Sequence, residues 1–125
     1  MGLAGYNSGS NHISPRELRE VYAKPFQAAI TDGHLMTVMN SYGNVDGAPI
    51  VGDKSMLTGL LREEMGFEGP TVSDYGAVSH LFNKHLCATR KEAAVRALDA
   101  GMDVECPNPK CYPSLTEAVR EGLLD

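Results

Sequence analysis

Apolar residues in the first third of the chain recur at the spacing of a helix. Ser14 suits the N-cap, Pro15 fits the first helical position, and Glu17 completes a capping box. The residues that follow at helical spacing predict one buried stripe, made of Leu18, Val21, Tyr22, Phe26, Ala29 and Ile30. Pro25 interrupts this pattern and cannot donate a helical hydrogen bond, so we expect a kink or two short helices there.

Three short apolar segments farther along the chain predict buried strands, at residues 35–39, 67–73 and 102–105. Gly33 ends the helix before the first strand, and turn-forming residues make a long loop after it. Residues 1–11, rich in Gly, Ser and Asn, also predict a loop.

Helical patterns follow these strands. The first runs over residues 54–65 and stops at Gly66. Capping boxes, Thr89 with Glu92 and Ser114 with Glu117, predict helices that run to Gly101 and to about Leu124.

The strands recur every 30 to 35 residues or so, which is the size of a βα unit in a parallel sheet. Both a (β/α)₈ barrel and a doubly wound sheet contain such runs. Three strands cannot close a barrel, which takes about eight. The pattern therefore predicts an α/β fold of roughly three βα units with a preceding helix, either a partial TIM barrel or a small open sheet.

Charge and composition narrow the function classes. The net charge of −5, without a Lys/Arg cluster, argues against binding nucleic acid. No apolar run reaches the roughly 18 residues of a membrane span, and no signal peptide is predicted, so the compartment stays open. The odd number of cysteines, Cys87, Cys106 and Cys111, and the absence of nearby ligands indicate unpaired thiols rather than a metal site or disulfide.

Functional groups of parallel α/β folds gather where the strands end, here at Asn40, Asp74 and Glu105. Asp74 is the most informative, because a carboxylate beside an aromatic ring suits attack on a sugar's anomeric carbon. An Asp after a strand is equally often the N-cap of the next helix. From position alone, both readings stay open.

Several linked motifs add to this reading. Residues 38–42 (VMNSY) and 46–49 (DGAP) resemble the VMxSYNxxDGxP stretch of glycoside hydrolase family 3. Residues 57–69 (LTGLLREEMGFEG) are similar to its LTxxLRxEWGFDG segment, and residues 70–78 (PTVSDYGAV) to its nucleophile signature xxVSDWGAV. The segment 93–105 and the helix at 15–30 also resemble family segments, so nearly the whole chain is covered in order.

The resemblance implies that residues 1–125 are part of a (β/α)₈ catalytic domain that hydrolyses terminal β-linked glycosides with retention, without metal or cofactor. Asp74 falls on the family's nucleophile, and Tyr42 on the Tyr that lies beside the first sugar. Tyr75 replaces the usual Trp at the entrance, and Met39 matches a Met at the strand end. The SDY sequence favours the β-glucosidase and β-xylosidase branch over the N-acetylglucosaminidases, which usually read SDD.

The chain also departs from the family pattern. Gly43 replaces an Asn, and Cys106 replaces a Met. The family's sugar-binding Lys-His pair, Asp and Arg lie in segments not present here, and its general acid/base is a Glu of a later domain. Glu105 is the only acid here placed to substitute, and a structural role suits it better. We therefore expect the remaining barrel and an acid/base domain as partners, and little or no activity from this chain alone.

Unpaired sheet edges in a partial barrel predict self-association.

Two rival functions remain. A phosphoacceptor signalling module also carries an Asp after a strand, but it needs two acids after the first strand to hold Mg²⁺, where this chain has Asn40 and Ser41. A carbohydrate-binding remnant would bind sugar without cutting it.

Overall fold

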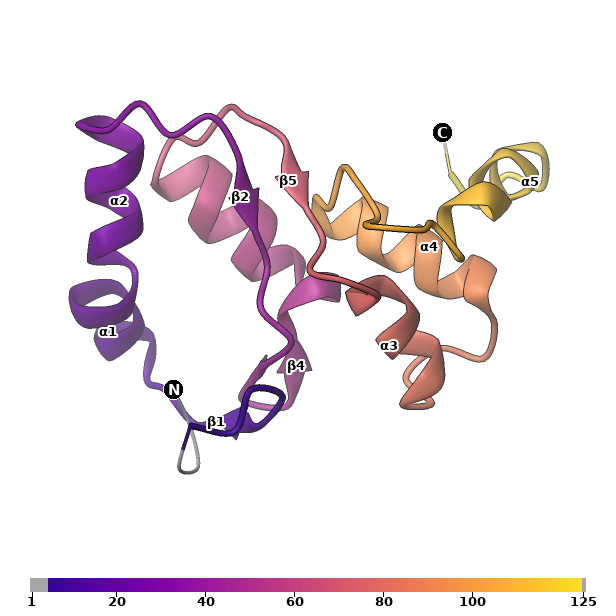
Figure 1. Cartoon of the computed structure of the whole chain (residues 1–125), viewed down its shortest axis with the longest axis horizontal. Coiled ribbons are helices and arrows are strands. Elements are labelled where there is room, and N and C mark those ends of the chain that lie inside the picture. The colour runs from indigo at the N-terminus through magenta and orange to yellow at the C-terminus, as the bar shows by residue number, and fades with distance from the viewer. Residues whose placement is uncertain (1–4, 125) are drawn as a thin grey trace.

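Short strands alternate with helices in the computed structural model, which describes residues 5–124 (Figure 1). The strands are β1 (Ser10–Asn11), β2 (Val38–Met39), β3 (Asn44–Val45), β4 (Ala48–Pro49) and β5 (Thr71–Val72). The α-helices are α1 (Pro15–Glu17), α2 (Lys24–Thr31), α3 (Ala77–Asn83), α4 (Arg90–Ala100) and α5 (Leu115–Arg120). Two π-helices, η2 (Leu18–Tyr22) and η4 (Ser55–Glu64), and two 3₁₀ turns, η3 (Ile50–Gly52) and η5 (Tyr112–Ser114), complete the elements.

The strands that the pattern predicts are parallel, as expected. β2 pairs with β5, and Val104 forms a parallel bridge with Val72 on the other side of β5. The strands are shorter than predicted, and Met36, expected inside a buried strand, is 83% exposed. Gly69 explains one limit, because a Cβ at this position would collide with the carbonyl oxygen of Met36. The segments around Gly69 and Met36 pass too closely there for side chains to alternate between the faces of a regular sheet.

A second small sheet lies where only loops were expected. β1 runs parallel to β3, and β3 pairs antiparallel with β4. Asp46 and Gly47, both with positive φ, form the two-residue turn between β3 and β4. An Asp-Gly pair is a strong hairpin signal, so the prediction of a long loop was wrong for a reason visible in the chain. Residues 1–4 of the predicted N-terminal loop lie outside the described residues.

The first helical segment breaks as Pro25 predicts, with η2 ending at Tyr22 and α2 beginning at Lys24. Ser14 Oγ accepts the amide of Glu17 at 3.2 Å, as expected of a cap. The predicted buried stripe was wrong for Val21, Tyr22 and Phe26, which are all substantially exposed. Tyr22 and Phe26 instead line an open groove, so helical spacing did not lead to burial there. Leu18 and Ile30 do pack against a buried cluster, so the prediction holds for part of the stripe.

Of the last three predicted helices, the first two, η4 and α4, follow the sequence signals for their ends, and the third does not. Gly66, with φ of +72°, follows η4, and Gly101, with φ of +107°, ends α4. Thr89 Oγ1 accepts the amide of Glu92 at 3.0 Å, which starts α4. The third expectation was wrong: Ser114 Oγ donates to the carbonyl of Cys111 instead of capping α5, which already ends at Arg120.

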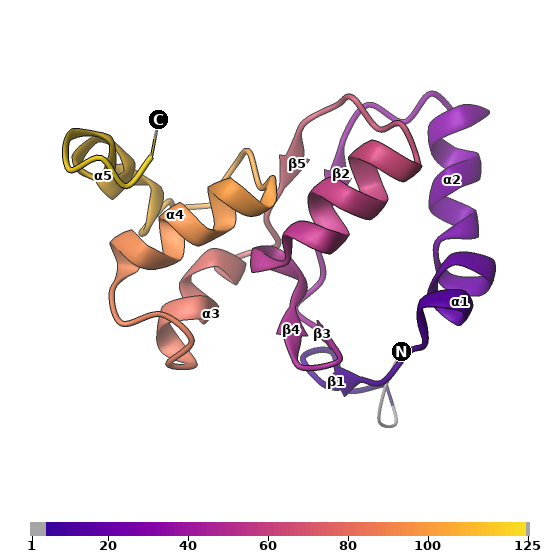
Figure 2. The same ribbon diagram turned by 180° about the vertical axis from the view of Figure 1, so that it is seen from behind.

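Two apolar clusters hold these elements together. The larger joins α3 and α4 with fully buried residues, among them Val78, Leu81 and Met102. The smaller joins η4 with the first helical segment through Leu60, Leu61 and Phe67, along with Ala23. In Figure 2, η4 lies in front of β2 and β5, so one face of the strand pair is covered by helix.

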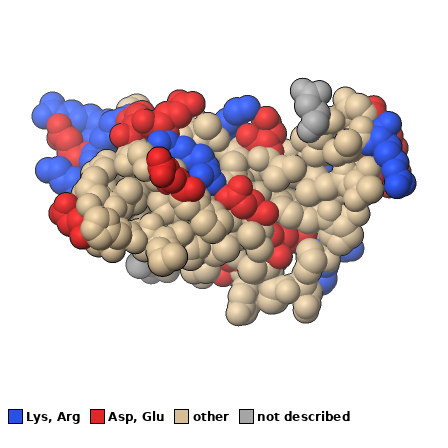
Figure 3. Space-filling model, turned by 90° about the horizontal axis from the view of Figure 1, so that it is seen from above, with Lys and Arg blue, Asp and Glu red and all other residues tan. Residues whose placement is uncertain are grey.

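The surface carries both signs of charge. In Figure 3, acidic and basic side chains are interspersed, and the basic ones form no continuous patch on the face shown. Within residues 5–124, no helix combines the length and apolar character needed to cross a membrane.

Candidate active site

Asp74 lies at the carboxyl end of β5, where the chain turns into α3. Its side chain is partly buried, and one carboxylate oxygen accepts the amide of Tyr75 at 2.7 Å. The N-cap of α3 is Gly76, which has φ of +73°, so Asp74 does not cap that helix. The alternative role of Asp74 as the N-cap of this helix is thereby excluded, and its carboxylate is available for another role.

The turn that carries Asp74 is bound to two other strand ends. Asn40, at the end of β2, accepts the amide of Asp74 on its side-chain oxygen at 2.9 Å. On the other side, the amide of Cys106 donates to Ser73 Oγ at 2.9 Å. The carbonyl of Cys106 accepts the amide of Gly76 at 3.0 Å. The carboxyl ends of three consecutive parallel segments therefore fix this turn, as expected for a functional site in such a fold.

Tyr42 lies against the same turn. Its hydroxyl donates to the carbonyl of Tyr75 at 2.8 Å, and its ring lies 5.2 Å from the ring of His80, tilted by 38°. Burial raises the pKa of the Tyr42 phenol, and the neighbouring Asp74 carboxylate adds to this rise because it opposes a second negative charge. The phenol therefore remains protonated beside Asp74 at neutral pH.

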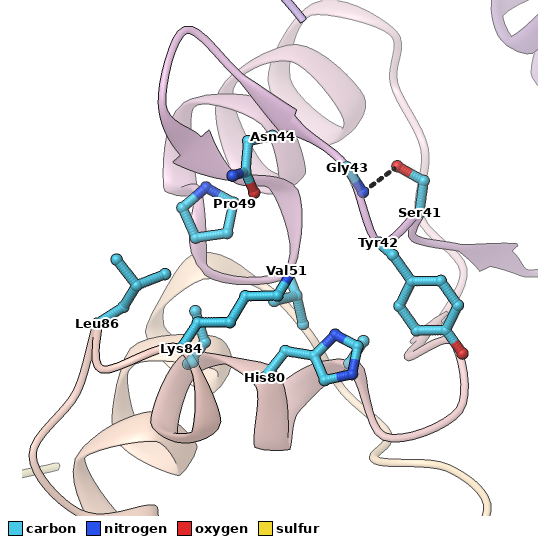
Figure 4. Close-up of a pocket in the computed structure, with 11 residues that line it drawn as sticks. Ser41, Tyr42, Gly43, Asn44, Pro49, Val51, His80, Lys84 and Leu86 are labelled. Carbon is cyan, nitrogen blue, oxygen red and sulfur yellow. Dashed lines mark hydrogen bonds between the residues drawn. The ribbon is translucent and has the colours of Figure 1, made fainter. Parts of the chain in front are cut away.

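His80, on α3, supports the Tyr42 ring. Burial lowers the pKa of His80, Lys84 lowers it further, and Asp74 acts in the opposite direction. Figure 4 shows the two rings next to each other on the wall of a small pocket between α3 and the β3–β4 hairpin. Asp74 does not line this pocket, so the pocket lies behind Tyr42 rather than in front of the carboxylate.

The other two predicted site residues differ in position. Tyr75 follows Asp74 directly and is 68% exposed, so its ring is open to a ligand. Met39 is 57% exposed and lines a wide apolar groove between the first helical segment and η4. Phe26 and Leu61 lie on opposite walls of this groove. The structure thus brings Tyr42 and Tyr75 to the Asp74 turn, whereas Met39 belongs to the groove.

Glu105 is buried and serves as an anchor for the loop that follows it. Its carboxylate accepts the amide of Cys111 at 2.9 Å and the amide of Tyr112 at 2.8 Å. Both carboxylate oxygens contact the Cys111 amide, which agrees with the structural role expected for Glu105. Cys87, Cys106 and Cys111 are free thiols, and no cluster of metal-binding side chains occurs within residues 5–124.

The hydrogen bond between the Asn40 side chain and the amide of Asp74 was not predicted from the sequence. The strand end at Asn40 was identified as a functional position, but the side-chain amide itself received no role. The signal was present in the register, because β2 and β5 are parallel and Met39 pairs with Val72. One step further along the ladder places Asn40 opposite Ser73, next to Asp74.

The chain is similar to known proteins in sequence and in structure. A β-glucosidase of Erythrobacter marinus is 39% identical and superposes with a TM-score of 0.94, covering 99% of this chain and 17% of that protein. A β-glucosidase of Listeria innocua is 35% identical with a TM-score of 0.90, covering 97% of this chain and 17% of its own. A xylan 1,4-β-xylosidase of Xylanibacter ruminicola is 39% identical over 113 residues, which are 90% of this chain and 13% of that enzyme.

The chain thus spans less than a fifth of the length of each of these relatives. Each of these matches extends over at least 90% of this chain. The family model described as the glycosyl hydrolase family 3 N terminal domain matches residues 1–125. The chain therefore belongs to glycosyl hydrolase family 3.

Proposed function

We propose that this chain supplies the nucleophile, Asp74, of a retaining glycosidase that removes terminal β-linked glucose or xylose. The carrying observation is the position of Asp74, whose carboxylate stands at the end of β5 without capping α3. The activities for which the relatives are named, β-glucosidase and β-xylosidase, support the choice of sugars.

The chemistry requires two carboxyl groups about 5 to 5.5 Å apart. A carboxylate oxygen of Asp74 attacks the anomeric carbon, and the glycosidic C–O bond breaks as an acid protonates the leaving oxygen. Water then displaces Asp74 from the covalent glycosyl intermediate and gives its proton to the same second group. Glu105 is occupied by backbone amides, so we propose that another part of a larger protein supplies this group.

Tyr42 and Tyr75 have supporting roles in this proposal. The Tyr42 hydroxyl remains protonated beside Asp74 and holds the carbonyl of Tyr75, which keeps the carboxylate-bearing turn in place. The exposed ring of Tyr75 offers an apolar face for a sugar or for the group that leaves. Met39 lines the wide groove, and in this proposal the remaining part of a (β/α)₈ barrel fills that groove.

The chain by itself is expected to hydrolyse neither p-nitrophenyl β-glucoside nor the matching xyloside. Turnover by the isolated chain that disappears in Asp74→Asn would contradict this part of the proposal. Self-association through the unpaired sheet edges also stays a prediction, and a single monomeric mass by light scattering at all concentrations would count against it.

The nucleophile is tested in a chimera in which this chain replaces the matching segment of the Listeria innocua β-glucosidase. We expect the chimera to hydrolyse one of the two substrates, and Asp74→Asn to reduce kcat by about 10³-fold or more. In Asp74→Gly, azide should restore turnover by attacking the anomeric carbon itself, with an α-glycosyl azide as product. An Asp74→Asn chimera with unchanged activity would disprove the assignment.

A further inference from the structure

The parallel ladder between β2 and β5 has an irregular last step. The amide of Val38 donates to the carbonyl of Pro70, and the amide of Asn40 donates to the carbonyl of Val72. In a regular parallel ladder, the next bond would run from the amide of Asp74 to the main-chain carbonyl of Asn40. The amide of Asp74 instead donates to the side-chain oxygen of Asn40, at 2.9 Å.

The side chain of Asn40 thus replaces its own main-chain carbonyl as the partner of Asp74. This substitution lets β5 leave the plane of the ladder after Val72 without leaving the Asp74 amide unpaired. Asn40 is only 5% exposed, so water cannot readily take over the bond. An unpaired amide in such a place is costly, which makes the bond a strong constraint on the turn.

An amide side chain is the chemical group that this position requires. Its oxygen accepts from Asp74, and its nitrogen donates to the carbonyl of Ser41 at 2.7 Å. The orientation of the amide follows from its partners, because a backbone N–H can only donate and a carbonyl can only accept. Aspartate would keep the acceptor but lose the donor, and it would add a negative charge next to Asp74.

We infer that Asn40 is a positioning residue for the nucleophile, fixing the main chain of Asp74 so that its carboxylate is held toward the substrate. This inference rests on the proposed role of Asp74. Asn40 does not touch the reacting atoms in this arrangement; it acts through the backbone of Asp74. Its loss should therefore affect kcat more than KM, because a misplaced nucleophile weakens the transition state more than it weakens binding.

The first test uses the chain itself and needs no activity. Amide hydrogen exchange measured by NMR should show the Asp74 amide exchanging at least about tenfold faster in Asn40→Ala, with the amide of Ser73 unchanged. Asn83→Ala, an exposed Asn at the end of α3, is the matched control and should leave both amides unchanged. Unaltered protection of the Asp74 amide in Asn40→Ala would overturn the inference.

Asn40→Asp keeps the shape of the side chain and guards against a variant that fails to fold. We expect the Asp74 amide to remain protected in this variant, since an acceptor oxygen is still present. An Asp74 amide that exchanges as fast as in Asn40→Ala would contradict the proposed geometry.

In the chimera, Asn40→Ala should lower kcat by about 10- to 100-fold with KM changed less than threefold or so. The exchange experiment and the chimera kinetics together distinguish failure of this inference from failure of the proposed function. Faster exchange at Asp74 with an active Asp74→Asn chimera would leave Asn40 as a backbone anchor but remove the nucleophile. A sensitive Asp74→Asn chimera with unchanged kcat in Asn40→Ala would keep the nucleophile and overturn the positioning role.

Discussion

The two ends of the molecule bury their apolar side chains to different extents. Around α3 and α4, the side chains of Val78, Leu81 and Met102 are fully removed from solvent. Along η2, α2 and β2, side chains of the same character, Phe26 and Met39, are about half exposed and line an open groove. In Figure 1 the first helices stand apart from β2, whereas α3 and α4 lie close together.

This difference teaches that one end forms a complete core by itself and the other end does not. The Asp74 turn lies between them and takes hydrogen bonds from both sides, from Asn40 at the open end and from Cys106 at the packed end. The backbone at Asp74 is therefore anchored from both sides, while the surface around Met39 depends on what fills the groove. The predictions below test this contrast.

The largest effect is expected from truncating the packed core. Leu81→Ala removes a fully buried side chain and should lower the free energy of unfolding by about 3 kcal/mol. Phe26→Ala, at a position that is 49% exposed, should cost less than about 1 kcal/mol although it removes more atoms. Urea titrations followed by circular dichroism measure both. Equal losses would show that the groove is as well packed as the core.

A smaller loss is expected from removing the Glu105 anchor. Glu105→Ala leaves the buried amides of Cys111 and Tyr112 without their acceptor, which should cost about 2 kcal/mol. Glu63→Ala, at an exposed position on η4, is the control and should stay within about 0.5 kcal/mol of the parent chain. The Cys111 thiol, buried in the parent, should also react faster with a thiol reagent in Glu105→Ala. A thiol that stays protected would argue against the anchor.

The smallest effect is expected from a single step in alkaline pH, from 10 to 11. Burial raises the pKa of Tyr112, and the charges of Glu105 and Asp103 raise it further. Because the unfolded phenol titrates near 10, the unfolded chain releases this proton first, so the stability is fully present below that pH. Above it, the free energy of unfolding should fall by up to about 1.4 kcal/mol per pH unit until the raised pKa is reached. The slope between pH 10 and 11 should decrease in Tyr112→Phe.

The other groups that titrate in this range define the background for that comparison. Burial also raises the pKa values of the Cys87 and Cys111 thiols, and that of Tyr42, so the parent chain should begin to lose stability already near pH 9. The difference between the parent and Tyr112→Phe isolates the one phenol. An identical slope in both proteins would mean that Tyr112 titrates normally in the folded state.

Much of the local structure could be predicted from short stretches of the chain. Ser14, Thr89, Gly66 and Gly101 mark helix ends correctly, because a cap or a left-handed turn depends on residues a few positions away. The Asp46–Gly47 hairpin could have been predicted on the same basis. Ser114 was wrong because a nearby carbonyl, that of Cys111, competes for its hydroxyl.

What the sequence by itself determined is the order of parallel βα units and the place of Asp74 at the end of one of them. Both follow from hydrophobic periodicity and from the motifs around Asp74. The tertiary structure alone decided which groups surround that carboxylate: Asn40, 34 residues away, takes its amide, and the His80 ring supports Tyr42. It also decided that the face with Phe26 stays open, because burial depends on what lies opposite a side chain as well as on its own polarity.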